Sequence, residues 1–178
     1  MSNKAIFFDR DGIVNYRKVN DYIKKVEEFK FIPAFFETLK ITKQNGYLAL
    51  LVTNQQGIGK GLYTAIDLAI IHNHMQQELL RLTGYKFDDI AFCPSLHEVN
   101  DFRRKPNPGM ILELIERYNL EPNHCWMIGD SESDILAAES AEIKSILIRE
   151  SFCKCNPTLR FDSLEQLNRV FSQIIRSV

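Results

Sequence analysis

The sequence predicts an α/β fold, in which helices cover both faces of a central parallel sheet to form a Rossmann-like three-layer sandwich. The first observation is that longer amphipathic segments alternate with five short apolar ones, at residues 5–8, 47–52, 90–93, 126–128 and 145–148. The second is that these short segments are apolar almost throughout, as strands buried on both faces are. The third is a length of 178 residues with 45% hydrophobic and 25% charged side chains, which suits a single domain over residues 1–178.

Local start and stop signals place helices between and after these strands. We expect helices at residues 33–44, 64–82, 108–118, 134–141 and from residue 163 onward. Thr64 with Asp67, and the segment 163–166, match the capping box that opens many helices. Asn107 is the expected N-cap of the third helix, with Pro108 at the favoured first position.

Composition and charge exclude several classes of protein. A formal net charge of -1 provides no basic surface for nucleic acid or an acidic membrane. No apolar run approaches the ~20 residues of a transmembrane helix, and the run before Asp9 is too short for a signal peptide. The four cysteines, at positions 93, 125, 153 and 155, are too sparse for a disulfide framework. We therefore expect a cytoplasmic monomer that acts on a small molecule.

Polar residues stand after the predicted strands, at the edge where open parallel sheets bind ligands. They are Asp9 and Asp11 after the first strand, Thr53 after the second, Lys105 beyond the third, and Asp130 and Asp134 after the fourth. Each alone has an ordinary interpretation, since Asp11-Gly12 is a common turn and Asp134 a common helix-capping residue. Together, four carboxylates, a hydroxyl and a lysine would converge on one edge of the sheet.

This combination of groups indicates phosphoryl chemistry with magnesium. Carboxylates that pack together repel one another unless a proton or a cation lies between them. Ligands that are all oxygen atoms suit Mg²⁺, which combines one or two carboxylates with water and phosphate oxygens. Lys105 would help the metal to neutralise a transferring phosphoryl group, and the flanking Pro106 and Pro108 restrict the backbone beside it.

The order of these groups resembles the four motifs of the haloacid dehalogenase superfamily. The motifs are Asp-x-Asp-Gly at 9–12, the strand-end Thr53, Lys-Pro at 105–106 and Gly-Asp-x-x-x-Asp at 129–134. Residues 8–15, 20–22, 52–61 and 104–110 also resemble the D-glycero-D-manno-heptose 1,7-bisphosphate phosphatases, and histidinol-phosphate phosphatases are similar. The resemblance implies a haloacid dehalogenase-like fold and a Mg²⁺-dependent phosphatase that forms an aspartyl-phosphate.

The resemblance favours one substrate over several alternatives. It implies a heptose bisphosphate 7-phosphatase that serves the synthesis of lipopolysaccharide precursors. The alternatives are a histidinol-phosphate or other small-metabolite phosphatase and, in another class, a phosphoacceptor regulatory or interaction domain without turnover. A polynucleotide 3′-phosphatase fits less well, because no basic groove or stacking aromatic residues accompany the motifs.

The same resemblance assigns roles to the predicted site residues. Asp9 would be the nucleophile. Asp11 would protonate the leaving oxygen and then activate water, a role that favours a carboxyl pKa raised by acidic neighbours. Thr53 and the Asn54 amide would hold phosphoryl oxygens, and Lys105 would bridge the phosphate and Asp9. The implied metal ligands are the Asp9 carboxylate, the Asp11 backbone carbonyl and Asp130, with Asp134 supporting the metal-bound waters.

The segment between the first strand and the first helix leaves no room for a large cap domain. We expect it to form a flap at about residues 12–31. Substrate contacts are expected from Asn20, Asp21, Tyr22, Asn54, Gln55, Lys60 and Arg104. These polar and basic side chains suit sugar hydroxyls and a second phosphate, and a solvated hairpin would have the same composition.

Three further patterns are interpreted as structural. The third glycine of the segment 57–61 falls one position early for a dinucleotide-binding G-x-G-x-x-G, so a glycine-rich rim is favoured. Heptose bisphosphatases with structural zinc carry two later cysteines where this chain has Asp101 and Arg103, so no structural zinc is expected. Cys153-Lys154-Cys155 is interpreted as a surface loop, and His72 and His74 as exposed or hydrogen-bonded residues of a helix.

Overall fold

A parallel β-sheet forms the centre of the protein in the computed structural model, which describes residues 3–149 and 154–177. Within these residues the six strands are β1 (Ala5–Phe8), β2 (Leu48–Asn54), β3 (Asp89–Cys93), β4 (Trp126–Gly129), β5 (Lys144–Ile148) and β6 (Leu159–Phe161). Their order is β3-β2-β1-β4-β5-β6, and each neighbouring pair is parallel. The predicted fold class is confirmed, because this is the strand order of doubly wound α/β proteins.

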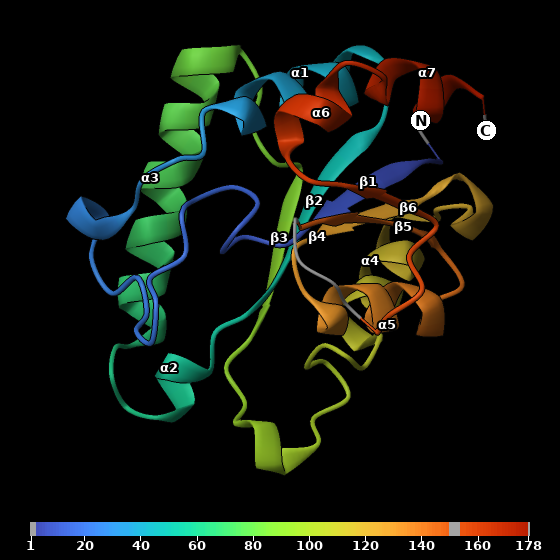
Figure 1. Cartoon of the computed structure of the whole chain (residues 1–178). Helices are drawn as coiled ribbons and strands as arrows, with labels where there is room; N and C mark the ends of the chain where they lie inside the picture. Colours follow the sequence, from blue (N-terminus) through green and yellow to red (C-terminus); the bar gives the residue numbers. More distant parts are fainter. Residues whose placement is uncertain (1–2, 150–153, 178) are drawn as a thin grey trace.

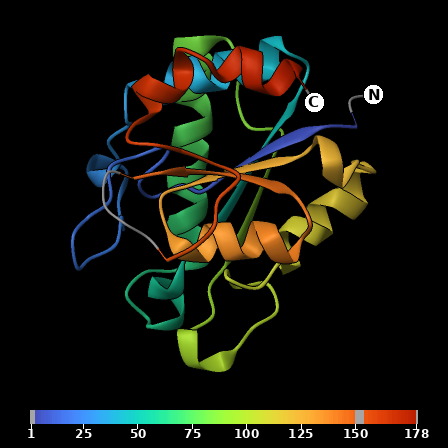
Figure 2. The same ribbon diagram turned by 45° about the vertical axis from the view of Figure 1, so that its right-hand side comes forward.

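Helices lie on both faces of the sheet, so the molecule has three layers (Figures 1 and 2). One face packs against α1 (Ala34–Gln44), α3 (Ala65–Thr83), α6 (Leu164–Asn168) and α7 (Phe171–Arg176). The other face packs against α4 (Gly109–Tyr118) and α5 (Glu132–Ser140). Short helices lie in the connections: α2 (Gln56–Gly59), η1 (Val26–Glu28), η2 (His97–Val99) and η3 (Pro122–His124). No helix in the described ranges is long and apolar enough to span a membrane.

The strands divide the core into two apolar layers because successive side chains of a strand point to opposite faces. In β1, Ile6 and Phe8 face the layer that includes α1 and α3, whereas Ala5 and Phe7 face the layer that includes α4 and α5. All four side chains are fully buried. Both faces of the sheet are therefore covered by helices, which explains why the strands are apolar throughout and could be predicted from composition alone.

The predicted strands, and the predicted helices before residue 163, lie within two residues of their observed bounds. The Thr64–Asp67 capping box is confirmed at the start of α3, and Ser163 caps α6. The predicted cap of α4 is wrong, because this helix starts at Gly109 with Pro108 as its N-cap. The Asn107 side chain instead donates to the Asp101 carbonyl oxygen at 2.9 Å.

The flap, residues 12–31, is fixed to the domain at its base and along its length. At the base, the Tyr16 amide donates to the Lys30 carbonyl oxygen, and the Ile32 amide donates to the Val14 carbonyl oxygen, both at 2.9 Å. Ile23 and Phe29 of the flap are buried in the core layer that includes α1 and α3. The flap therefore covers the carboxyl end of β1 as an ordered segment held by backbone pairing and apolar contacts.

Candidate active site

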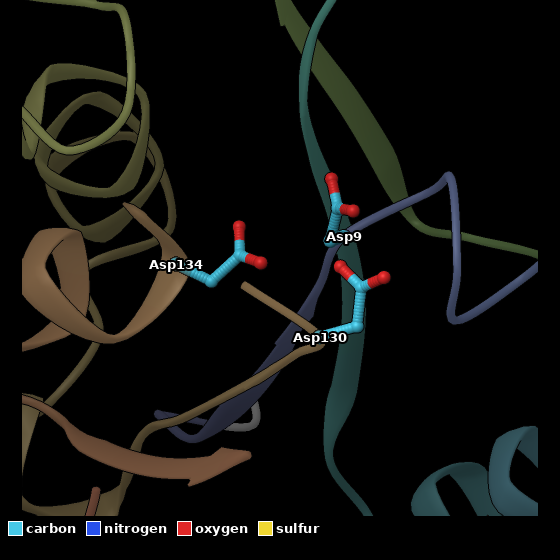
Figure 3. Close-up of side chains that lie close together, drawn as sticks. All are labelled: Asp9, Asp130 and Asp134. Atoms are coloured by element: carbon cyan, nitrogen blue, oxygen red, sulfur yellow. The ribbon is translucent and has the colours of Figure 1, made fainter. Parts of the chain in front are cut away.

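Three aspartates meet at the carboxyl edge of the sheet, where β1 and β4 lie side by side. Asp9 follows β1, Asp130 follows β4, and Asp134 lies in the first turn of α5. One carboxylate oxygen of each lies within 4.8 Å of the others, and Figure 3 shows the three side chains close together. The strand order brings them together, because the chain reverses its direction of winding between β1 and β4.

Lys105 holds this acidic cluster together. Its Nζ atom lies 2.7 Å from Oδ1 of Asp9 and 2.6 Å from Oδ1 of Asp134, and it donates to the Val52 carbonyl oxygen at 2.8 Å. The Lys105 side chain is 3% exposed. A buried ammonium group persists only where charged and polar partners replace water, and here two carboxylates and a carbonyl oxygen surround it.

The carboxyl groups still carry an excess of negative charge. Burial, reinforced by the charges of Asp134 and Asp130, raises the pKa of Asp9 to about 7 against the opposing effect of Lys105. Burial and Asp134 likewise raise the pKa of Asp130 to about 6, against the opposing effect of Arg17. Burial alone would lower the pKa of Lys105, but Asp134 and Asp9 outweigh it and raise that pKa above its ordinary value. At neutral pH the site therefore favours an additional cation.

The side chain of Arg17, on the flap, lies where that cation is required. Its Nη2 atom donates to Oδ1 of Asp130 at 2.8 Å and to the backbone carbonyl oxygen of Asp11 at 3.2 Å. These are two of the three groups predicted to bind magnesium. The donor set is entirely oxygen and partly anionic, so it fits Mg²⁺. No pattern in the sequence indicated this contact of Arg17.

One oxygen of Asp134 is hydrogen-bonded within the protein, and the other has an ion-pair contact but no hydrogen bond. Oδ2 accepts from the Ser131 amide at 3.1 Å and from the Ser131 hydroxyl at 2.6 Å, while Oδ1 faces Lys105. Asp134 is therefore both the helix-capping residue of the ordinary interpretation and a member of the acidic cluster. The predicted role of Asp134, which is to support the metal-bound waters, stays a prediction.

The Asp11 side chain is enclosed by donors, which corrects the prediction about its pKa. Arg10 Nη2 donates to both Asp11 oxygens at 3.1 and 2.9 Å, Asn15 Nδ2 donates at 2.9 Å, and Gln55 Nε2 donates at 3.0 Å. Burial by itself raises the pKa of Asp11, but the Arg10 charge and these hydrogen bonds bring it below its ordinary value. The acidic neighbours were expected to raise the pKa of Asp11. Their effect is outweighed, because the hydrogen-bond donors contact the Asp11 carboxylate directly and the neighbouring carboxylates do not.

A second layer of polar groups supports this enclosure from α3. Arg10 is 1% exposed, and its Nη1 atom lies 3.3 Å from Nε2 of His72. Burial and the Arg10 charge lower the pKa of His72 to about 3, so the ring is neutral and accepts from Arg10 at physiological pH. Tyr63 donates to Oε1 of Gln55 at 2.5 Å. The prediction of a hydrogen-bonded histidine is thus confirmed for His72.

A cavity of about 590 Å³ opens over the acidic cluster. It brings together many of the predicted site residues, namely Asp9, Asp11, Lys105, Asp134, Asn54, Asn20, Asp21, Tyr22 and Lys60. The cavity is also lined by four residues that were not predicted as site residues from the sequence, namely Gln56, Leu62, Ser131 and Ser133. Its volume lies in the ordinary range for small-molecule sites, about 300–1,000 Å³.

Four predicted residues do not line this cavity, namely Thr53, Gln55, Arg104 and Asp130, and Asp130 lines a neighbouring pocket instead. Gln55 is 1% exposed and links Asp11 to Thr53, whose hydroxyl accepts from Gln55 Nε2 at 2.9 Å. Arg104 does not line the cavity itself. Its Nη2 atom donates at 3.3 Å to Oε1 of Gln56, which does line it. The expected substrate contact of Gln55 is therefore replaced by a structural one, in which its side chain fixes Asp11.

The glycine-rich segment forms a packing site for the flap. A Cβ atom at Gly57 would lie 2.3 Å from Cε1 of Tyr63 and 3.0 Å from Cγ of Tyr22. Glycine is needed here because the two aromatic rings occupy the space of a side chain. The segment therefore packs against the flap through Tyr22. The interpretation of this segment as a glycine-rich rim of the site, and not as a dinucleotide-binding loop, stays a prediction.

The cysteines do not gather at one place within the described residues. Cys93 and Cys125 are buried and free. Cys93 Sγ lies 3.6 Å from Oδ2 of Asp101, which occupies one of the positions discussed above for zinc. Cys155 is half-buried and disulfide-bonded, and Cys153 lies outside the described residues. The absence of structural zinc stays a prediction.

Known proteins resemble this chain over most of its length. The HAD-hydrolase-like family model matches residues 102–167. The D-glycero-beta-D-manno-heptose-1,7-bisphosphate 7-phosphatase of Helicobacter pylori (strain J99) is 42% identical over 83% of this chain and 83% of its own length. The D-glycero-alpha-D-manno-heptose-1,7-bisphosphate 7-phosphatase of Burkholderia mallei is 36% identical over 83% of this chain and 80% of its own length. The chain belongs to the D-glycero-D-manno-heptose-1,7-bisphosphate 7-phosphatase family.

A solved structure gives the same relationship in three dimensions. The crystal structure of D,D-heptose 1,7-bisphosphate phosphatase from B. bronchiseptica, complexed with magnesium and phosphate, superposes with a TM-score of 0.85 at 25% identity. The match covers 98% of this chain and 99% of that one. The heptose bisphosphatase family thus includes a member of this fold that binds both of the groups expected at the acidic cluster.

Proposed function

We propose that this chain is a magnesium-dependent phosphatase that removes the 7-phosphate of D-glycero-D-manno-heptose 1,7-bisphosphate. The observation that carries the proposal is the buried Asp9–Lys105 pair at the floor of a cavity, in a chain of the heptose bisphosphatase family. The product is a heptose precursor for lipopolysaccharide. We also infer that the enzyme is a cytoplasmic monomer. Family membership favours turnover over the alternative of a phosphoacceptor domain.

The first chemical step belongs to Asp9. A carboxylate oxygen of Asp9 attacks the phosphorus of the 7-phosphate, the bond to the sugar oxygen breaks, and an aspartyl-phosphate forms. Lys105 lies 2.7 Å from Asp9 and neutralises charge on the transferring group. Water then attacks the phosphorus, which releases inorganic phosphate and restores the carboxylate. Thr53 and the Asn54 amide hold the phosphoryl oxygens during both steps.

Asp11 acts as the general acid of the first step and as the general base of the second. Its lowered pKa makes it a carboxylate in the free enzyme, which suits the second step, where it accepts a proton from the attacking water. The first step needs the protonated form. A phosphate dianion near Asp9 adds negative charge, and negative charge raises the pKa of a neighbouring carboxyl group. Arg10, Asn15 and Gln55 hold the Asp11 side chain in place for both roles.

Magnesium completes the site. Asp9, the Asp11 backbone carbonyl and Asp130 would hold the ion, and Asp134 would fix its surroundings through Ser131 and Lys105. The bound ion supplies positive charge that stabilises the phosphoryl group during transfer. Arg17 contacts two of these groups, so its side chain leaves them when the ion binds.

The second phosphate of the substrate needs a cation that no carboxylate already neutralises. Lys18 lies 3.1 Å from Asp21 and 3.0 Å from Glu28, and Lys24 lies 2.9 Å from Asp21, so these two flap lysines have anionic partners. Among the described residues, Arg104 forms no ion pair, since it donates to the Ser95 carbonyl oxygen and to the Gln56 side chain. Lys60 lies 5.6 Å from the centre of the Tyr22 ring. We therefore assign the distal phosphate to Arg104 and Lys60.

A comparison of two substrates tests the proposal. Heptose 1,7-bisphosphate should have the higher kcat/KM, and histidinol phosphate the lower one, because its ammonium group is repelled by Arg104 and Lys60. Charge-assisted hydrogen bonds contribute about 1.5–3 kcal/mol each, so Arg104→Ala should reduce the preference at least tenfold. Arg103→Ala is the matched control, since Arg103 pairs with Glu113 at 2.9 Å. A preference for histidinol phosphate, or an unchanged ratio in Arg104→Ala, would refute the substrate assignment.

A further inference from the structure

The connection between β3 and α4, residues 94–108, is organised around one carboxylate. Oδ1 of Asp101 accepts from the Arg103 amide at 2.8 Å, and Oδ2 accepts from the Ser95 hydroxyl. The Asp101 backbone carbonyl accepts from the Arg104 amide at 3.0 Å and from Asn107 Nδ2 at 2.9 Å. Asp101 thus ties both ends of the connection to the segment that carries Arg104.

These contacts form a closed ring around Arg104. The Arg104 amide donates to the Asp101 carbonyl oxygen, and its Nη1 atom donates to the Ser95 carbonyl oxygen at 2.9 Å. The Ser95 hydroxyl in turn donates to Asp101, which closes the ring. A long side chain on a surface connection normally samples many rotamers, whereas here both its backbone and its guanidinium group are held.

The ring is anchored to the wall of the cavity. A Cβ atom at Gly59 would lie 2.6 Å from the Pro94 carbonyl oxygen, so the connection packs directly on α2 (Figures 1 and 2). Arg104 Nη2 donates to Gln56, which lines the cavity. On the other side of Arg104, the Lys105 amide donates to Oδ1 of Asn54 at 3.1 Å. Arg104 is therefore fixed between Asp101 and the catalytic lysine.

The charges in the ring are arranged so that Arg104 keeps its positive charge available. The hydrogen bonds from Ser95 and the Arg103 amide lower the pKa of Asp101, so it is ionised at neutral pH. Asp101 accepts from a hydroxyl and from backbone amides, whereas the guanidinium group donates to the neutral oxygens of Ser95 and Gln56. An anion that contacts the guanidinium group therefore displaces no carboxylate.

We propose that Asp101 is a positioning residue that orders Arg104 and thereby sets the preference for a sugar bisphosphate over the corresponding monophosphate. This inference rests on the proposed function, in which Arg104 contacts the distal phosphate. Ordering a side chain before the substrate arrives raises affinity, because the loss of rotamer freedom no longer opposes binding. Asp101 acts only through Arg104, so it affects substrates that carry the distal phosphate and spares those that lack it.

A double-mutant cycle tests this coupling with heptose 1,7-bisphosphate and heptose 7-phosphate as the two substrates. Arg104→Ala should lower kcat/KM for the bisphosphate at least tenfold and that for the monophosphate less than twofold. Asp101→Ala should lower the bisphosphate value about fivefold, mainly through KM, with the same small effect on the monophosphate. The double variant should be no worse than Arg104→Ala alone, because contacting groups are not additive. Multiplying effects, or equal losses on both substrates, would overturn the inference.

Two further variants separate positioning from general stability. In Asp101→Asn, the amide oxygen accepts from Arg103 and the amide nitrogen donates to Ser95, so the preference should stay within twofold of wild type. Glu98→Ala, an exposed carboxylate in the same connection, should change nothing. Two results together would overturn the inference: Asp101→Asn loses the preference for the bisphosphate, and Glu98→Ala lowers it as much as Asp101→Ala does. They would show that any change of charge in this connection is sufficient to alter the preference.

Amide hydrogen exchange gives a readout that does not depend on the substrate. The Arg103 amide loses its acceptor, Oδ1 of Asp101, in Asp101→Ala. This amide and the adjacent Arg104 amide should therefore exchange at least tenfold faster in that variant than in wild type or Glu98→Ala. An unchanged exchange rate would overturn the inference whatever the kinetics. If the wild-type enzyme shows no preference for the bisphosphate, the proposed function fails, and hydrogen exchange still decides whether Asp101 orders Arg104.

Discussion

Replacement of Asp9 by asparagine tests the nucleophile and the electrostatics of the acidic cluster in one variant. Asparagine has nearly the same shape as aspartate, so the packing at the end of β1 is preserved. It cannot form an aspartyl-phosphate, and we expect phosphate release below about a thousandth of the wild-type rate. It also removes one of three carboxylates that lie within 4.8 Å of one another, two of which are buried. The variant should therefore be inactive and, in the absence of magnesium, more stable than wild type.

The size of the stability gain follows from the pKa of Asp9. Burial is the largest of the effects that raise this pKa from 3.8 to about 7. A carboxyl group whose pKa is raised by folding destabilises the folded state when it ionises. This cost is absent below pH 3.8, grows as the pH rises and is complete above about pH 7. At about 1.36 kcal/mol for each pH unit, it reaches about 4 kcal/mol.

The assay is thermal unfolding of both proteins in EDTA, followed by circular dichroism between pH 5 and pH 8. We expect Asp9→Asn to be more stable at pH 8 by about 2–4 kcal/mol, since the asparagine loses the attraction of Lys105 that the carboxylate has. In a chain of this size, each kcal/mol corresponds to about 2–4 °C in Tm. The gain should shrink by about 3 kcal/mol as the pH falls from 8 to 5, where wild-type Asp9 is protonated.

Two results would contradict this reasoning. A gain that is the same at pH 5 and pH 8 would mean that titration of Asp9 does not cause it. A variant less stable than wild type at pH 8 in EDTA would mean that the ion pair with Lys105 outweighs burial and the repulsion from Asp130 and Asp134. Saturating Mg²⁺ serves as the control, because a cation between the carboxylates should reduce the advantage of the variant.

Two other predictions concern the metal and the lysine. EDTA should abolish activity and Mg²⁺ should restore it, while elemental analysis after dialysis should find no stoichiometric zinc; one retained zinc per chain would contradict the interpretation of Asp101 and Arg103. Lys105→Met should lower the free energy of unfolding by about 3–5 kcal/mol in urea denaturation without metal, because it leaves Asp9 and Asp134 unpaired in a buried site. Arg81→Met, which breaks an exposed ion pair with Glu78, is the control and should change stability little.

The sheet could be predicted from the sequence wherever a strand is covered on both faces. The strands β1 to β5 are almost continuous apolar runs because helices cover both sides of the sheet. The edge strand β6 was missed, since it has three residues and its central Arg160 is exposed. The last helix was predicted as one element and is two, α6 and α7, with Arg169 and Val170 between them. Short or half-exposed elements carry too few buried positions for a periodic signal.

The position of the acidic cluster could be predicted for a related reason. Parallel strands end at the same edge, so a residue that directly follows a strand is placed by topology alone. Asp9 and Asp130 belong to this class, and Lys105 is held by two hydrogen bonds between its backbone and the Asn54 side chain. Arg17 does not belong to it, because its contact with Asp130 depends on the path of the whole flap. No local pattern encodes that path.

The environment of Asp11 shows most clearly what the sequence leaves undetermined. Asp9 and Asp11 are two residues apart, and the acidic neighbours in the sequence predicted a raised pKa for Asp11. In the structure their pKa values move in opposite directions, because the intervening Arg10 is buried and contacts Asp11. Groups with separated pKa values can take different roles at one pH. The division of labour between Asp9 and Asp11 thus depends on a buried arginine whose placement requires His72, a residue 62 positions away on α3.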